Sequence, residues 1–235
     1  MKPVYAELFC RSNFSFQHGA SRPEELLEAA HRLGYGAIAI TDECSLAGAA
    51  RAYAGWRALC EKHGQTIDTM QLRLIVGACF LAADSEVVLL AQTKIGYERL
   101  CQLITKCRIN ASKGSYLFNP RDLSDIKECF AIIIPGTSPE PLFEHTASLN
   151  RALGYTRKLT ATDPLRFERA LSLAQEHNLL LTACGDILIH DKSRQALQDI
   201  LTAVRHHTTV DQLGQLAEQN AERCCTNPES NSHRT

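Results

Sequence analysis

Residues 36–48 read GAIAITDECSLAG, and this stretch contains the clearest strand in the sequence. The run 36–41 is almost continuously apolar and is bounded by glycine and aspartate, which is typical of a strand buried on both faces, as in a parallel sheet. The segment before it predicts a helix that starts at Ser21, with Glu24 completing a capping box, and ends at Gly34. A helix leading into a buried strand indicates an α/β fold.

The same alternation of strands and helices continues along the chain. Strands are predicted at 4–9, 72–77, 86–91, 130–134 and 179–183, and helices at 46–62, 95–107, 164–177 and 192–206. The last of these helices carries an apolar stripe at positions 197, 200, 201 and 204. Alternating elements of this kind imply βαβ units with right-handed crossovers, and therefore a parallel sheet or barrel.

Composition and charge limit the classes of function. The chain has 235 residues, of which 45% are hydrophobic, and its formal net charge is -1. Proteins that bind nucleic acid tightly and without sequence preference usually have a basic surface, so we expect contact with DNA to be local or made through a partner. No apolar run is long enough to cross a bilayer and no signal peptide is recognisable, so we expect a cytoplasmic protein without membrane contact.

The ten cysteines do not form any C-x-x-C pair, which argues against a zinc ribbon or a thioredoxin-type site. In a reducing compartment most of them should be small, buried apolar residues. Cys44, Cys60, Cys101, Cys107 and Cys184 lie in apolar sequence surroundings that fit this interpretation.

Several residues able to bind metal follow the predicted strands, at the ends where function gathers in parallel α/β folds. These candidates are His18, Glu43, Cys79, Asp186 and His190. A hydrolytic metal site needs several inward-facing ligands and an open position for water. Phe9 and Leu188 are apolar and Arg11 would repel a cation, so the set falls short of such a site.

Each candidate also has a local structural explanation. Asp42 is predicted to cap the helix that follows it, and His18 precedes Gly19 in a predicted turn. His190 stands just before the helix at 192–206 and can simply begin it. Of the five candidates, Glu43 is the one that local structure explains least.

Several segments, matched in order, carry a resemblance to a known family. They are YAELFCRSNFSFQHGASRPEELLEAAHRLGYGAIAITDECSLAGAARAY (5–53), LRLIVGACF (72–80), KGSYLFNPRDL (113–123), LLLTACGDILIHDKSRQALQDILTAVR (179–205) and NAER (220–223). Together they resemble the PHP (polymerase and histidinol phosphatase) domain of bacterial error-prone DNA polymerases, which are relatives of the DNA polymerase III alpha subunit. The resemblance predicts a PHP domain over residues 1–223, and the polar composition of the remainder predicts a short, disordered tail at 224–235.

The resemblance implies a distorted (β/α)7 TIM-like barrel with a metal cluster at the strand ends. The family's first His-x-His is replaced by Phe9 and Arg11, and its late Asp-x-His appears as Asp186 and Leu188. The positions that keep a possible ligand are His18, Glu43, Cys79 and Asp186, with His190 nearby in the sequence. We therefore expect a degenerate site with no catalytic residue, no bound metal and no cofactor.

The function implied by the resemblance is that of a non-catalytic module of an error-prone, translesion DNA polymerase, acting in DNA replication and damage tolerance. Its expected partners are the polymerase body or other translesion-synthesis proteins, with DNA contacted only indirectly. The carboxylates of a polymerase palm are absent, so the chain alone is not expected to polymerise DNA and resembles an isolated N-terminal domain.

Two alternatives remain open. One is a stand-alone PHP phosphoesterase that uses Zn²⁺ or Mn²⁺ in the reduced site. The other is a non-functional remnant.

Overall fold

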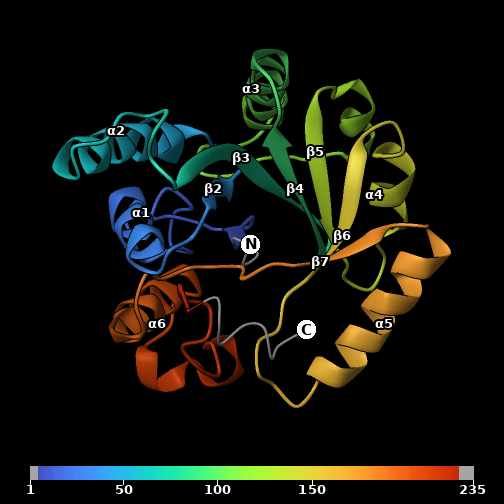
Figure 1. Cartoon of the computed structure of the whole chain (residues 1–235). Coiled ribbons are helices and arrows are strands. Elements are labelled where there is room, and N and C mark those ends of the chain that lie inside the picture. The colour runs from blue at the N-terminus through green and yellow to red at the C-terminus, as the bar shows by residue number, and fades with distance from the viewer. Residues whose placement is uncertain (1–4, 228–235) are drawn as a thin grey trace.

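A computed structural model describes residues 5–227, in which seven strands form one curled sheet (Figure 1). The strands are β1 (Ala6–Glu7), β2 (Ala37–Glu43), β3 (Arg73–Ala82), β4 (Ser85–Ala91), β5 (Cys129–Ile134), β6 (Asn150–Tyr155) and β7 (Leu180–Ala183). They follow one another in the sheet in sequence order. This arrangement confirms the predicted distorted (β/α)7 barrel.

Strand β4 runs antiparallel to both of its neighbours, whereas the other pairs in the sheet are parallel. The two residues Ala83 and Asp84 connect β3 to β4, and Ala82 pairs with Ser85. A two-residue connection can join only antiparallel strands, because a parallel pair needs a crossover of a dozen or more residues. The wholly parallel sheet expected from the sequence is therefore wrong at this one strand.

The barrel is closed by the segment that follows β7. Cys10 forms a parallel bridge with Ile187, the Arg11 N–H donates to the Ile187 carbonyl (2.8 Å), and the Ile187 N–H donates to the Phe9 carbonyl (3.0 Å). These bonds bring the loop that contains Asp186 directly beside the end of β1.

The helices lie around the outside of the sheet (Figure 1). They are α1 (Pro23–Arg32), α2 (Ala47–Lys62), α3 (Lys94–Ile109), α4 (Glu140–His145), α5 (Asp163–Glu176) and α6 (Gln195–Arg205). Short 3-10 helices are η1 (Pro120–Asp125), η2 (Lys192–Arg194), η3 (Val210–Gln212) and η4 (Gly214–Leu216). Among the described residues, no helix has the length and apolar character that crossing a membrane requires.

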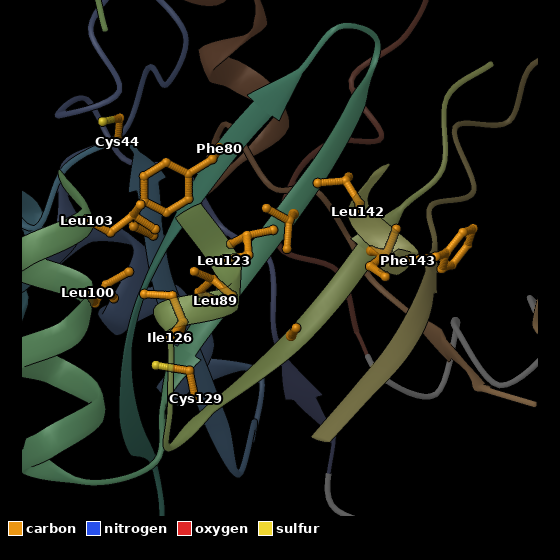
Figure 2. Close-up of a cluster of buried hydrophobic side chains, with 14 of the residues drawn as sticks. Cys44, Phe80, Leu89, Leu100, Leu103, Leu123, Ile126, Cys129, Leu142 and Phe143 are labelled. Atoms are coloured by element: carbon orange, nitrogen blue, oxygen red, sulfur yellow. The ribbon is translucent and has the colours of Figure 1, made fainter. Parts of the chain in front are cut away.

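Alternating residues of β4 build the core on both faces of the sheet. Val87 and Leu89 belong to the cluster beneath α3, where Figure 2 shows Leu100 and Leu103 of the helix directed at the sheet. Val88 instead belongs to the cluster inside the barrel, together with Phe9, Ala39, Cys79, Leu90, Ile132 and Cys184. Because both faces of such a strand are buried against apolar side chains, its residues form a continuous apolar run in the sequence.

The cysteines are free thiols, and all except the half-buried Cys101 are buried. Cys224 pairs with Ile189, and the Tyr35 hydroxyl donates to the Thr226 carbonyl (2.8 Å). The packed part of the chain thus extends past residue 223, the predicted end of the domain. The remainder of the predicted tail, 228–235, lies outside the described residues.

Candidate functional site

Asp42, at the end of β2, organises the loop that follows β1. Its carboxylate accepts hydrogen bonds from the backbone N–H groups of Ser12 (2.7 Å) and Ser15 (3.1 Å) and from both serine hydroxyls (2.8 Å each). Burial raises the Asp42 pKa even though these hydrogen bonds act to lower it. The prediction that Asp42 caps the next helix is wrong, because Leu46 occupies the cap position and the side chain that bonds there is Ser45, whose Oγ accepts from the Ala47 N–H (3.2 Å).

Arg11 lies at the centre of a buried cluster of polar side chains, the Arg11 cluster, and its own side chain is only 5% exposed. Its Nε donates to Cys79 Sγ (3.4 Å), and its guanidinium forms ion pairs with Glu86 and with Asp186 (3.3 Å). The same group lies over the Phe9 ring, 4.5 Å from the ring centroid. Burial lowers the Arg11 pKa, but Cys79, Glu86 and Asp186 outweigh burial and raise it, so the side chain is a permanent cation.

Three cationic side chains surround the Asp186 carboxylate. Its carboxylate pairs with Arg223 (2.6 Å), Arg11 (3.3 Å) and Lys158 (3.8 Å), and its carbonyl accepts from Arg223 Nε (2.9 Å). Burial would raise the Asp186 pKa, but these cations lower it to about 2. Arg223 is also paired with Glu218. The carboxylate is therefore ionised and already surrounded by cations.

His18 and Glu43 lie together beside the Arg11 cluster, with partly exposed side chains and 3.6 Å between Nε2 and Oε2. The Tyr116 hydroxyl donates to the other Glu43 oxygen (2.8 Å). Burial lowers the His18 pKa to about 4, and the nearby Arg205 and Arg11 add to that effect while Glu43 opposes it. His18 is consequently a neutral imidazole near pH 7.

The sequence of the chain matches the family model described as "PHP domain" over residues 7–182. The chain belongs to the PHP domain family. An error-prone DNA polymerase from Vibrio vulnificus is 40% identical over 224 residues, covering 93% of this chain and 21% of the relative. An error-prone DNA polymerase from Pseudomonas aeruginosa is 42% identical over 227 residues, covering 94% of this chain and 21% of the relative. The resemblance seen in the sequence is confirmed, and the PHP domain spans about a fifth of the length of these curated relatives.

Solved structures agree on the fold. A protein from Bifidobacterium adolescentis, described as a metal-dependent phosphoesterase, superposes with a TM-score of 0.56 at 17% identity, covering 78% of this chain and 88% of its own. An amidohydrolase from Chromobacterium violaceum, with bound sulfate and no metal, superposes with a TM-score of 0.52 at 12% identity. The superposition covers 79% of this chain and 88% of the amidohydrolase. At these identities the likeness extends to the fold alone.

The predicted site residues of this PHP domain do not all converge. Cys79 and Asp186 both contact Arg11, while His18 and Glu43 form a separate, partly exposed pair. His190 lies apart from them, bonded to the Ser21 hydroxyl (2.8 Å) and 3.9 Å from Glu25. Ser21 is thus not the cap of α1. The Arg22 N–H instead donates to Glu25 (2.9 Å), one residue later than predicted.

The three substituted positions have structural roles in the PHP domain. Phe9 fills the barrel interior, and Leu188 packs against Ala20, Ile189 and Cys224. Arg11 supplies a buried positive charge. Within residues 5–227 no three His, Cys, Asp or Glu groups are arranged to hold one metal ion. The residues present therefore do not fit the Zn²⁺ or Mn²⁺ cluster that the family resemblance implies.

Sequence reasoning missed Glu86, Lys158 and Arg223 as members of the Arg11 cluster. Glu86 is near the start of β4, and because that strand is antiparallel its start lies at the carboxyl ends of its neighbours. Lys158 follows β6, a strand that was not predicted. Arg223 belongs to the segment NAER, which the resemblance includes, and that segment was the available signal.

Proposed function

We propose that this PHP domain is a non-catalytic module of an error-prone DNA polymerase, supporting the polymerase body or binding a partner protein during DNA damage tolerance in the cytoplasm. The observation that carries the proposal is the buried Arg11, bonded to Cys79, Glu86 and Asp186. The relatives named error-prone DNA polymerase support the context.

Electrostatics argues against metal-dependent hydrolysis at the Arg11 cluster. Two unit charges 4 Å apart interact by about 4 kcal/mol at an effective dielectric constant of about 20, and a dication doubles that repulsion from each fixed cation. A metal ion held by Cys79 or Asp186 would meet the guanidinium of Arg11, with Arg223 and Lys158 close by. The arginine already neutralises the carboxylates that a metal ion would otherwise bind.

The proposed module contacts DNA only indirectly. Basic and acidic side chains are nearly equal in number, 25 Lys and Arg against 26 Asp and Glu, so the surface lacks the excess positive charge that holds a phosphate backbone. We therefore expect such a domain to be brought to DNA by contacts with other proteins and not by direct binding to the phosphate backbone.

The test combines metal analysis with activity assays. We expect substoichiometric metal in the purified protein, and neither phosphatase nor 3′–5′ exonuclease activity after addition of Mn²⁺ or Zn²⁺. The near-isosteric Asp186→Asn variant is compared with Glu61→Ala, which removes a carboxylate whose side chain is 74% exposed. Stoichiometric metal together with activity that Asp186→Asn abolishes and Glu61→Ala retains would refute the proposal.

A further inference from the structure

Helix α6 exposes apolar side chains and buries polar ones, which is the reverse of what an isolated domain requires. Leu197, Ile200 and Val204 are 37%, 49% and 51% exposed, whereas Gln198 and Thr202 are each only 3% exposed. The apolar stripe of a surface helix ordinarily faces the core. Three of the four positions in the stripe read from the sequence instead face solvent.

The orientation of α6 is fixed by contacts at its start and along one side. Arg194, just before the helix, forms an ion pair with Glu25 of α1 (2.5 Å), which ties the start of α6 to α1; Figure 1 shows the position of both helices. Leu201 packs on the cluster that contains Leu188 and Ile189. The helix therefore cannot turn its exposed stripe inward without breaking these contacts.

The buried face of α6 gains little from its burial. The Thr202 hydroxyl donates to the Gln198 carbonyl within the helix (2.9 Å), and Gln198 Oε1 has no hydrogen-bond partner in the described part of the chain. A buried polar atom without a partner costs about 1–3 kcal/mol. An arrangement that is unfavourable on both faces of a helix indicates that the outer face is covered by another surface.

The candidates for that covering surface differ in how well they fit. The eight residues 228–235 read PESNSHRT and contain no large apolar side chain, so they cannot cover the stripe. A second copy of this chain would pair one short stripe of three side chains with another. Such a contact buries little surface, whereas stable dimers bury about 800 Å² on each partner. In the polymerase relatives, about four-fifths of the polypeptide lies outside the matched domain and offers much more surface.

We propose that the exposed stripe of Leu197, Ile200 and Val204 is a docking surface for an apolar patch on the remainder of an error-prone polymerase. The inference rests on the proposed function and identifies the surface through which the module attaches. Contacts between domains of one chain typically bury 600–1,500 Å² and centre on apolar side chains such as these.

The first test grafts this domain onto a polymerase. Residues 1–227 replace the matched segment of the Pseudomonas aeruginosa polymerase, and amide hydrogen exchange is measured in α6 of the chimera and of the separate chain. We expect exchange at least about tenfold slower in the chimera, because docking adds to the free energy of local opening. Ile200→Glu should remove that protection, and Ile109→Glu, at a 76% exposed position on α3, should leave it.

A second measurement does not depend on the folding of the chimera. The helix that aligns with α6 is followed by hydrogen exchange in the intact Pseudomonas aeruginosa polymerase, where the same slow exchange is expected. Equal exchange rates in the polymerase context and in the separate chain would overturn the proposal. So would a dimer of the separate chain, seen by sedimentation, that Ile200→Glu abolishes. Neither readout uses metal or activity, so a failure of the docking surface is distinguishable from a failure of the non-catalytic role.

Discussion

Replacing Arg11 with methionine tests whether the buried guanidinium stabilises the folded domain through the Arg11 cluster. The substitution keeps much of the side-chain volume but leaves Glu86 without its closest ion-pair partner, while Asp186 retains Arg223 and Lys158. Removing one member of a buried ion pair costs about 3–5 kcal/mol. Because the Glu86 side chain is 23% exposed and Asp186 keeps two partners, we expect about 3 kcal/mol, at the low end of that range.

The assay is urea unfolding at pH 7 followed by circular dichroism, with a thermal melt beside it. For a chain of this length about 1 kcal/mol corresponds to about 2–4 °C in Tm, so the midpoint should fall by about 6–12 °C. Arg51→Met is the matched control, since Arg51 is 61% exposed in its pair with Glu24 and should cost about 1 kcal/mol or less. The double variant Arg11→Met with Glu86→Gln should regain part of the loss. A loss from Arg11→Met no larger than that from Arg51→Met would refute the reasoning.

Three further outcomes are expected at the same end of the barrel. Burial lowers the pKa of folded His18 from its ordinary 6.5 to about 4, so the wild type should lose stability as pH falls from 6.5 to 4, and His18→Gln should lose less. The check is an NMR titration of His18, and a pKa above about 6 would contradict this. Gly48→Ala should destabilise the folded domain by about 1–3 kcal/mol, because the added Cβ would lie 2.1 Å from the carboxylate of Asp42, which four hydrogen bonds hold in place. This cost should outweigh the better helix propensity of alanine. An unchanged urea midpoint would contradict it. Tyr116→Phe removes the hydrogen bond that the hydroxyl donates to Glu43 and the one that it accepts from the Leu81 N–H (3.1 Å), and should cost about 1 kcal/mol in urea unfolding. The absence of any shift in the urea midpoint would contradict this.

The apolar runs predicted most of the sheet because strands buried on both faces are apolar throughout. The run at 36–41 became β2, and the runs at 130–134 and 179–183 became β5 and β7. The segment Asn150–Tyr155 was missed because it combines polar, charged and glycine residues in only six positions. The direction of β4 was missed because the apolar pattern of a buried strand is the same in both orientations.

Site geometry was predictable only where it depended on the ends of parallel strands. Arg11, Cys79 and Asp186 were all placed at that end from the sequence, and they meet there. His190 follows the same segment as Asp186 but turns away to Ser21, since a few residues of loop are enough to separate two side chains. Which cation pairs with which carboxylate depends on long-range packing, and local sequence does not encode it.

The guanidinium of Arg11 is covalently part of the polypeptide, so its positive charge cannot leave the cluster as a bound metal ion can. A metal centre is lost to chelators and varies with the metal supply of the cell, whereas this charge is present as soon as the chain folds. The domain should therefore melt at the same temperature with and without EDTA. A polymerase that carries such a domain would keep this part of its structure intact when metal ions are scarce.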